Sequence, residues 1–316
     1  MVRFGVCCCF RDVVIRFRTT TAAAMLRLPR ATRLERLAEL ALANAAALRE
    51  AIRYCASQGI GCFRINSQIL PLLTHPEAGY AASDLPDAES IVAAFVACGR
   101  TAARAGVRLT FHPDQFVVLS SPKEQVIRNS IAELEYQAMV ADWVGADVIT
   151  LHGGGAYGDK ISALDRLRRN LSSLSAGARS RIALENDDRV FTPTDLLPLC
   201  GSEGVPFVYD VHHHRCLPDG LSTDEVTRRS IATWNREPLF HVSSPQGGWR
   251  AANPRVHADF VRVSDFPECW KVLQVTVEVE ARAKEAAVLR LMGAVAARPS
   301  VAAGPRATRT TAGGLA

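Results

Sequence analysis

The sequence predicts an α/β protein built as a single TIM (β/α)8 barrel. Eight short apolar or β-branched runs punctuate the 316 residues, and segments with helical periodicity separate most of them. Strands that alternate with helices form parallel sheets, and eight is the number of strands that closes a TIM barrel. An open doubly wound sheet is the main alternative, but no G-x-G-x-x-G motif follows the first run.

Each expected element occupies a short stretch of the chain. The expected strands are residues 3–9, 60–65, 107–111, 147–151, 181–185, 205–210, 239–243 and 274–280. The expected helices include 34–57, 88–105, 123–144, 160–174 and 192–200. Thr192 before Pro193, and Ser222 before two acidic residues, are typical helix starts. From Val295 onward Ala, Gly, Pro, Thr and Arg dominate, which predicts a disordered tail over 294–316 after a barrel domain over 1–293.

The composition excludes several classes of protein. The chain is 48% hydrophobic and 22% charged, so it is not collagen-like, disordered or a disulfide scaffold. The nine cysteines form no C-x-x-C pair, which disfavours a zinc ribbon. No apolar run is long enough to span a membrane, and Arg11, Asp12 and Arg16 interrupt the apolar start that a signal peptide needs. We expect a cytoplasmic protein with no membrane partner.

The net charge of +5 does not identify a partner. Seven arginines in residues 1–33 and three in 291–316 account for it, and the central residues 34–290 have a balance of −4. Basic ends alone are weak evidence for binding to nucleic acid. The function must therefore be inferred from particular side chains.

The chemistry is expected at the ends of the strands. His and acidic residues lie at six strand ends, namely His112, His152, Glu185, Asp210 with His212–His214, His241 and Glu280. In a barrel the C-terminal ends of all strands open into one mouth, so these residues converge. One such histidine would usually be a hydrogen-bonded core residue, but six together predict a multinuclear site for divalent metal ions. Mixed imidazole and carboxylate ligands favour Mn, Zn, Fe or Co over Mg or Ca.

This ligand set leaves two reactions open. Two or three ions a few ångströms apart suit the hydrolysis of a phosphodiester, because they activate water and neutralise the charge that develops at phosphorus. The same ligands could also support an aldose–ketose isomerase, which moves a hydride on a metal-chelated sugar. The spacing of the residues does not separate these reactions.

Several longer strings resemble the UV damage endonuclease family. They are FHPDQFVVLSSP (111–122), ITLHGGGAYGDK (149–160), LENDD (184–188), YDVHHHRC (209–216), PLFHVSSP (238–245) and VEVEARAKE (277–285), with weaker matches at 63–76 and 130–138. The resemblance covers roughly residues 34–292. It implies a TIM barrel related to endonuclease IV and an enzyme that cuts damaged double-stranded DNA immediately 5′ to cyclobutane dimers, 6-4 photoproducts and some abasic sites. The products are a 3′-hydroxyl and a 5′-phosphate, which start excision repair.

The resemblance also implies a set of site residues. The implied metal ligands are His112, His152, Glu185, Asp210, His213, His241, His257 and Glu280, with His75 as a further candidate. Glu185 is the implied bridging carboxylate, and it shares the catalytic role with Asp210, His241 and Glu280. The implied cofactor is a cluster of two or three divalent ions, with Mn²⁺ expected and Zn²⁺ or Co²⁺ as alternatives. The implied oligomeric state is a monomer.

Alternation along a strand refines this ligand set. Glu278 and Glu280 share one face of the last strand, because side chains alternate with period two. Glu280 is nearer the C-terminal end and is the better ligand, so Glu278 is expected to serve the shell beneath. If the sixth strand continued through the three histidines, His212 and His214 would point together and His213 oppositely. Residues 186–188 are expected either to orient ligands or to cap the next helix.

The resemblance further implies residues that contact DNA. Gln115 and Phe116 occupy the positions of a pair that pushes into the duplex at the lesion, although Phe116 could instead be ordinary core at the base of a loop. Tyr157 and Lys160, in a glycine-rich segment, could contact a phosphate. Arg255 is another phosphate candidate, with solvated surface as its alternative.

Three departures from the family distinguish this chain. Val6 stands where a Tyr is usual, with Phe10 near the position of a usual Asn, and Leu239 stands where many members have a Lys that can be carboxylated. Residues 10–33 match the family's first loop poorly. We expect these changes to alter substrate affinity more than reaction type. A non-enzymatic damage sensor is a second rival, beside the sugar isomerase.

Overall fold

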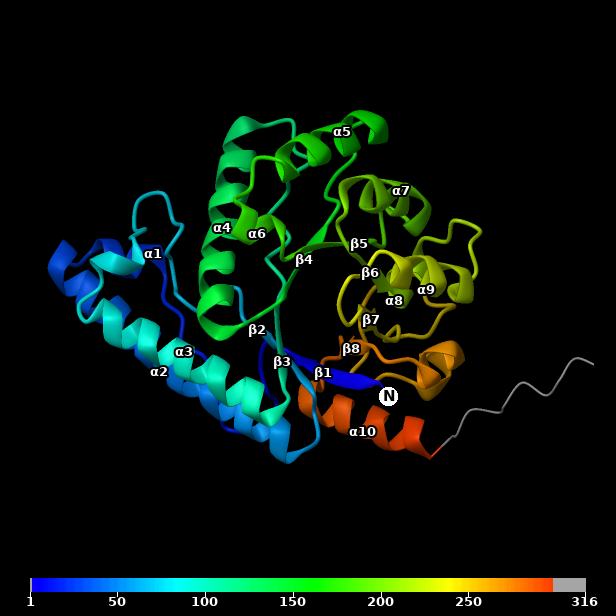
Figure 1. Cartoon of the computed structure of the whole chain (residues 1–316), viewed down its shortest axis with the longest axis horizontal. Coiled ribbons are helices and arrows are strands. Elements are labelled where there is room, and N and C mark those ends of the chain that lie inside the picture. Colours follow the sequence, from blue (N-terminus) through cyan, green and yellow to red (C-terminus); the bar gives the residue numbers. More distant parts are fainter. Residues whose placement is uncertain (1, 298–316) are drawn as a thin grey trace, which may run out of the picture.

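Eight parallel strands close into a barrel, in the order in which they occur along the chain. The structure is a computed structural model that describes residues 2–297. Each strand pairs with the next, and the last pairs with the first, so the TIM barrel expected from the sequence is confirmed (Figure 1). The strands are β1 (Arg3–Cys7), β2 (Cys62–Ile65), β3 (Arg108–Phe111), β4 (Val148–His152), β5 (Ile182–Glu185), β6 (Phe207–Asp210), β7 (Leu239–Val242) and β8 (Thr276–Val279).

The helices lie around the outside of the barrel (Figure 1). They are α1 (Ala22–Leu26), α2 (Arg30–Ser57), α3 (Ala88–Ala105), α4 (Glu124–Val144), α5 (Lys160–Leu171), α6 (Ala176–Arg179), α7 (Pro193–Glu203), α8 (Val211–Cys216), α9 (Thr223–Ala232) and α10 (Lys284–Ala296), with short 3₁₀ turns η1 (Ala82–Asp84), η2 (Val263–Asp265) and η3 (Glu268–Val272). None of the helices described is long and apolar enough to cross a membrane.

Of the element boundaries that differ from the sequence prediction, two concern the expected first loop and the expected tail. The helix α2 begins at Arg30 directly after Pro29, four residues before the expected start, so part of the poorly matched first loop is helical. The helix α10 continues to Ala296, where the alanines favour a helix although the flanking composition suggests disorder. Residues 294–296 are therefore helical, and the predicted tail beyond Ala297 lies outside the described residues.

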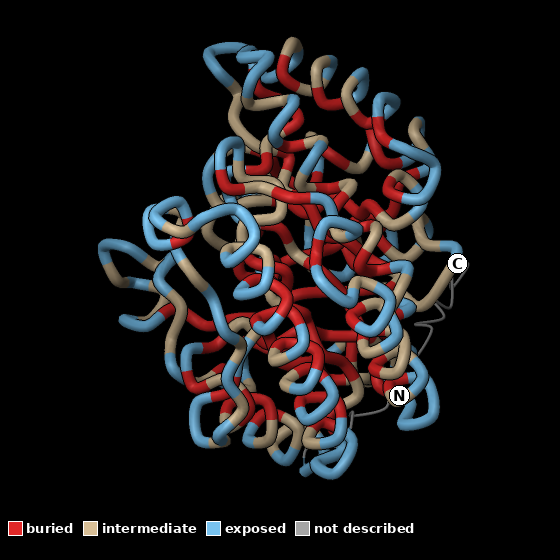
Figure 2. Tube along the Cα trace, turned by 90° about the vertical axis from the view of Figure 1, so that its left-hand side faces the viewer, coloured by how far each residue is buried: buried red, intermediate tan, exposed pale blue. Residues whose placement is uncertain are grey.

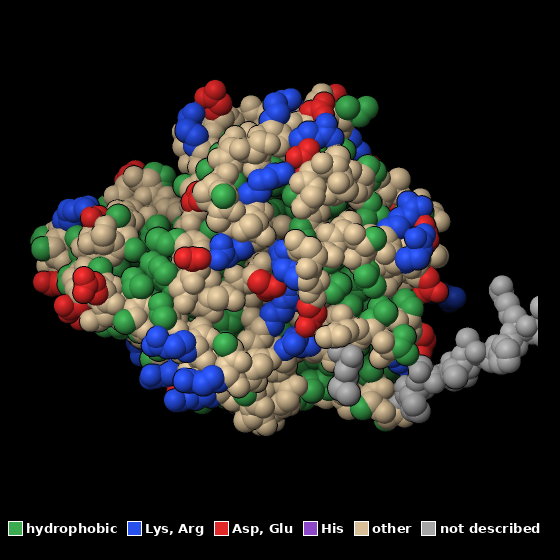
Figure 3. Space-filling model, viewed as in Figure 1, with side chains coloured by type: hydrophobic (Ala, Val, Ile, Leu, Met, Phe, Trp, Pro, Cys, Tyr) green, Lys and Arg blue, Asp and Glu red, His purple; other side chains and the backbone are tan. Residues whose placement is uncertain are grey.

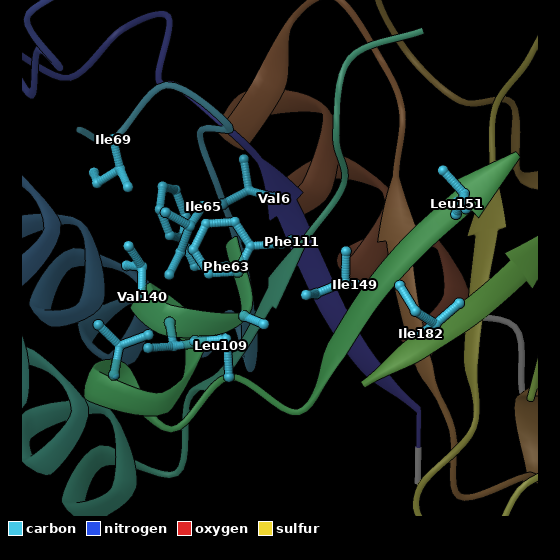
Figure 4. Close-up of a cluster of buried hydrophobic side chains, with 14 of the residues drawn as sticks. Val6, Phe63, Ile65, Ile69, Leu109, Phe111, Val140, Ile149, Leu151 and Ile182 are labelled. Atoms are coloured by element: carbon cyan, nitrogen blue, oxygen red, sulfur yellow. The ribbon is translucent and has the colours of Figure 1, made fainter. Parts of the chain in front are cut away.

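The larger apolar core lies between the barrel and its helices. Val6, Phe63 and Phe111 are fully buried there, and Figure 4 shows these side chains beside Ile65 and Val140. The buried stretches lie at the centre and the exposed ones on the outer faces of the helices (Figure 2). The helices α3 and α4 pack so closely that a Cβ on Gly99 would lie 2.6 Å from the carbonyl oxygen of Val144.

The inside of the barrel changes from apolar to polar along its axis. Near the N-terminal ends of the strands a small separate cluster consists of Val148, Ala183, Val208 and Leu239. One step further along strands β5, β6 and β7, the inward positions are Glu185, Asp210 and His241, since side chains alternate with period two. The apolar layer closes the base of the barrel, and the polar residues lie at its mouth.

Candidate metal centre

Glu185 is the centre of the polar layer at the mouth. Its side chain is fully buried at the end of β5. One carboxylate oxygen, Oε2, lies 2.9 Å from Nε2 of His112 and 3.7 Å from Nε2 of His152. The other, Oε1, lies 3.0 Å from Nδ1 of His241 and 3.3 Å from Nδ1 of His213. Four imidazoles from four different segments thus surround one carboxylate.

Two groups of side chains around Glu185 have the spacing of metal ligands. His112, His152 and Glu185 form the first group, and Glu185, Asp210 and His213 form the second. Within each group the donor atoms lie within 4.8 Å of one another. Because Glu185 belongs to both groups, it can bridge two ions.

Asp210 shows that the site fits a cation. Its Oδ1 accepts the backbone N–H of His213 at 2.7 Å, but its Oδ2 is buried and has no hydrogen-bond partner among the described residues. A buried carboxylate oxygen without a partner is costly, and an absent ion is one of the explanations for such an atom. The mixed nitrogen and oxygen donors are those of transition-metal sites.

The charged residues of the cluster shift one another's pKa values. Burial alone would raise the pKa of Glu185, but the surrounding His241, His152, His112 and His213 outweigh burial and hold the pKa well below its usual range. Burial and the charge of Arg64 oppose protonation of His241, but Glu185 and Glu278 outweigh them and raise its pKa to about 10. These two shifts favour an ionised Glu185 beside a protonated His241. Binding of a metal ion to such imidazoles would release protons.

The three consecutive histidines lie on a helix, because the sixth strand ends at Asp210 as its expected bounds predict, so the extended geometry considered for them does not apply. The helix α8 starts directly after Asp210, whose side chain caps it by accepting the N–H of His213. An Asp before a helix satisfies the free N–H groups of its first turn, and this local bond wins over continuation of the strand. Residues three apart on a helix lie on the same side, which brings His213 to Asp210 and Glu185.

The other two histidines of this helix serve different contacts. His214 lies 2.8 Å from the hydroxyl of Tyr209 and 2.8 Å from Oδ1 of Asp219. His212 is fully buried and packs against the ring of Trp249. Among the three, only His213 belongs to the ligand groups.

Residues 186–188 both orient the cluster and shape the loop that follows. The amide of Asn186 donates to the carbonyl of Asp210 and accepts from its N–H, and the Asn186 carbonyl lies 3.0 Å from Nδ1 of His213. Asp187 accepts the backbone N–H groups of residues 189–191. Asn186 therefore positions two ligands, whereas Asp187 stabilises the turn.

Glu280 and His257 lie at the edge of the cluster. Oε1 of Glu280 is 3.5 Å from Nδ1 of His241, and its Oε2 is 3.8 Å from Nδ1 of His257. A backbone bridge between Pro245 and His257 fixes the loop that carries this histidine. Both residues adjoin the two ligand groups without belonging to either.

A buried arginine that sequence reasoning did not single out lies beneath these residues. Arg64, an inward residue of β2, forms ion pairs with both Glu278 and Glu280. Glu278 lies in the deeper layer, as the alternation along β8 predicts, and is almost fully buried. The signal for Arg64 was its inward position next to the last residue of β2.

His75 lies outside both ligand groups. Its Nδ1 accepts the backbone N–H groups of Glu77 and Ala78, each at 3.1 Å, and so fixes the turn in which it lies. The side chain lines a cavity of about 670 Å³, which Gln115 and Phe116 also line. The structure thus places His75 beside the expected DNA-probing pair, and its role as a ligand stays a prediction.

Phe116 projects from the protein, and the alternative that it is ordinary core is wrong. Its side chain is 78% exposed, in the loop between β3 and α4. Gln115, beside it, is also exposed. An aromatic ring that points into solvent beside a cluster of ligands is free to contact another molecule.

The three expected phosphate contacts differ in how freely they can move. Tyr157 is 52% exposed and has a positive φ of 51°, in the glycine-rich loop after β4. Lys160 forms an ion pair with Asp195 at 2.8 Å, and Arg255 pairs with Asp188 at 3.4 Å. Tyr157 can therefore reach a ligand directly, while the two cations must exchange partners to do so.

The residues that depart from the family lie away from the mouth. Val6 is fully buried in the outer core, and the ring of Phe10 stacks on Phe63 with 5.6 Å between centroids. Leu239 belongs to the apolar layer that closes the base of the barrel. None of these three side chains belongs to the ligand groups, and their effect on substrate affinity stays a prediction.

The chain is similar to known proteins along most of its length. The family model described as UV-endonuclease UvdE matches residues 2–303. A UV DNA damage endonuclease of Bacillus velezensis is 34% identical over 287 residues, 87% of each chain. One of Deinococcus radiodurans is 33% identical and covers 92% of this chain and 95% of its own. The crystal structure of SacUVDE has a TM-score of 0.83 and 26% identity, and covers 94% of this chain and 99% of its own.

More distant structures share the fold alone. Endonuclease IV of Thermus thermophilus has a TM-score of 0.56 at 19% identity, and a D-psicose 3-epimerase of Clostridium cellulolyticum has 0.54 at 14% identity. The barrel by itself therefore leaves both reactions open.

Fold and site together define a TIM barrel with a candidate metal centre at the C-terminal ends of its strands. The match to the family model and the two relatives then decide the family. The chain belongs to the UV-endonuclease UvdE family.

Proposed function

We propose that this protein is a metal-dependent repair endonuclease that hydrolyses the phosphodiester bond 5′ to UV photoproducts, and also acts at abasic sites. The observation that carries the proposal is the pair of ligand groups that share Glu185, near a loop with an exposed Phe116. The family membership supports a substrate of damaged DNA. The products would be a 3′-hydroxyl and a 5′-phosphate.

The residues present would hold two ions in the two ligand groups, and a third beside Glu280, His257 and His241. When bound, divalent ions such as Mn²⁺ activate water near neutral pH and neutralise the charge that builds up on the phosphate. Glu185 would hold two ligand groups at a fixed separation. Asn186 would keep Asp210 and His213 in place through its hydrogen bonds.

The exposed loop would supply recognition of the lesion. A damaged dinucleotide stacks and pairs poorly, so extruding it costs less than extruding normal bases. Phe116 would fill the resulting gap by stacking, and Gln115 would replace lost base contacts. Tyr157 would contact the backbone. Basic and acidic side chains are interspersed on the face drawn in Figure 3.

A nicking assay tests this proposal. The substrate is a labelled duplex with one defined photoproduct, with and without Mn²⁺, beside an undamaged duplex. A Mn²⁺-dependent cut just 5′ to the lesion, leaving a 3′-hydroxyl, is expected. No cut by a preparation shown to contain bound metal would refute the activity on photoproducts, and abasic DNA and sugar substrates would be tested next.

One substitution separates the enzyme from a damage sensor. Glu185→Gln removes the bridging charge, so an endonuclease loses cleavage and keeps lesion binding. Equal behaviour of the variant and the wild-type protein in both assays would support a sensor. We propose that the protein acts as a monomer, which its mass in solution with and without DNA would test.

A further inference from the structure

Arg64 forms a buried ionic network directly beneath the candidate metal centre. Its side chain is only 8% exposed, although it carries a permanent charge. The Nε and Nη2 atoms contact Oε2 of Glu278, the Nε atom at 2.6 Å, while Nη1 lies 2.7 Å from Oε1 of Glu280. One guanidinium therefore holds two carboxylates of β8, one above the other.

Glu278 is saturated with contacts and points away from solvent. Its Oε1 accepts the hydroxyl of Thr110 and lies 3.7 Å from the sulfur of Cys62. A Cβ on Gly5 would lie 3.2 Å from Cγ of Glu278, so the missing side chain at Gly5 makes room for this carboxylate. The neighbours on β1, β2 and β3 thus hold Glu278 in one orientation.

This network determines which nitrogen of His241 faces the cluster. Nε2 of His241 lies 3.1 Å from Oε2 of Glu278, and Nδ1 lies 3.0 Å from Oε1 of Glu185. Nε2 also lies 2.9 Å from Nη2 of Arg64, so both members of the Arg64–Glu278 ion pair contact the nitrogen that faces away from Glu185. Contacts of this kind at the outer nitrogen orient the ring of a histidine ligand.

The same network determines the direction of Glu280. Its Oε1 is occupied by Arg64, so Oε2 is the oxygen that faces His257. An arginine can do this because its planar fork presents several donors in fixed directions, whereas a lysine has one point of attachment.

We propose that Arg64 is a positioning residue, which acts through Glu278 and Glu280 to hold His241 and Glu280 in the geometry that binds metal ions. This inference deepens the proposed function, because it rests on the same site. The proposal predicts that Mn²⁺ affinity falls when Arg64 is removed, whereas a simple charge effect predicts that it rises. A cation that acted only by repulsion would weaken the binding of Mn²⁺, so its removal would strengthen it. A positioning residue has the opposite effect.

The test measures Mn²⁺ binding by the full-length protein, by titration in competition with a chelator and by metal content after dialysis. For Arg64→Met we expect Mn²⁺ affinity to fall at least tenfold, within the range that loss of outer contacts around metal ligands causes. For Arg64→Lys, which keeps the charge but not the fork, we expect a smaller loss. On a damaged duplex Arg64→Met should lower kcat and leave KM nearly unchanged, because the residues expected to contact DNA lie away from Arg64.

The matched control is Arg108→Met. Arg108 is also a buried arginine of the barrel, with 9% exposure, but it pairs with Asp147 and Thr276 near the N-terminal ends of the strands. We expect this variant to lower the melting temperature and to leave Mn²⁺ affinity within twofold of the wild-type value. If it weakened Mn²⁺ binding as much as Arg64→Met does, the effect would be one of general stability and the proposal would fail.

A second variant keeps the test decisive if Arg64→Met does not fold. Glu278→Gln has the same shape and removes the charge that Arg64 and His241 face, so Mn²⁺ affinity should again fall. Tighter or unchanged binding in this variant, or in Arg64→Met, would overturn the proposal. Because metal binding is measured without DNA, a wild-type protein that binds Mn²⁺ but never nicks would refute the proposed function and leave the role of Arg64 open to this test.

Discussion

Phe116→Ala should separate the recognition of a lesion from the stability of the fold. In the folded protein 78% of this side chain is exposed, so only about a fifth of it is buried. Full burial of a Phe side chain contributes about 1.5–3 kcal/mol, so truncation should reduce the free energy of unfolding by only about 0.5 kcal/mol. The same ring, stacked against a base, contributes about 1–3 kcal/mol to binding.

The expected result is a large change in one measurement and almost none in the other. A loss of about 1–3 kcal/mol corresponds to a fall of roughly 5- to 150-fold in affinity for a duplex with one photoproduct, since 1.4 kcal/mol is tenfold. Binding is measured by fluorescence anisotropy without Mn²⁺, so that cleavage does not interfere, and stability by urea unfolding. Phe116→Trp keeps an aromatic ring and should retain most of the affinity.

A buried phenylalanine provides the matched comparison. Phe111 ends the strand that leads into the same loop and is fully buried, so Phe111→Ala should cost about 3–5 kcal/mol of stability. If Phe116→Ala destabilised the protein to that extent, or bound damaged and undamaged DNA exactly as the wild-type protein does, the ring would not be a probe of the duplex.

Three other experiments test the packing, a buried carboxylate and the metal centre. Gly99→Ala places a Cβ 2.6 Å from the Val144 carbonyl, so urea unfolding should show a loss of about 1–3 kcal/mol; an unchanged midpoint would contradict the close packing. Hydrogen bonds from Thr194, Leu221 and His214 outweigh burial and lower the pKa of Asp219 to about 2 from 3.8. This carboxylate therefore adds about 2 kcal/mol above pH 4 that is lost as pH falls towards 2, and Asp219→Asn should abolish that part of the pH dependence. Saturating Mn²⁺ should raise the melting temperature of the wild-type protein, by about 2.7 kcal/mol of stability at a hundredfold excess over Kd. An equal shift in Glu185→Gln would argue against its bridging role.

The barrel could be predicted because each strand is marked locally. A run such as ITLH (149–152) is short, apolar and β-branched, and a helical segment follows it. The type and order of the elements can therefore be predicted from residues that are close together in the sequence. Because the C-terminal ends of barrel strands meet at one mouth, the residues at those ends are expected to lie close together even when no distance is known. His112, His152 and Glu185 were found in this way, and they form one ligand group.

What the sequence could not supply were contacts made across the barrel. Asp210 could act as a ligand, as a helix cap or as both, and only the folded chain shows that its two oxygens divide these tasks. Arg64 looked like any other of the many arginines, because its role depends on Glu278, which lies 214 residues away. Val6 and Phe10 differed from the family at positions whose side chains turn out to pack in the outer core.

The order of the strands also sets when this site can exist during synthesis. Its residues extend from Arg64 to Glu280, and the barrel closes only when β8 pairs with both β7 and β1. A ribosome-bound chain that has not yet emerged past β8 lacks Glu280 and the closing strand, so it cannot hold the complete cluster. The endonuclease site would thus stay incomplete until β8 has been synthesised and has paired with its two neighbours.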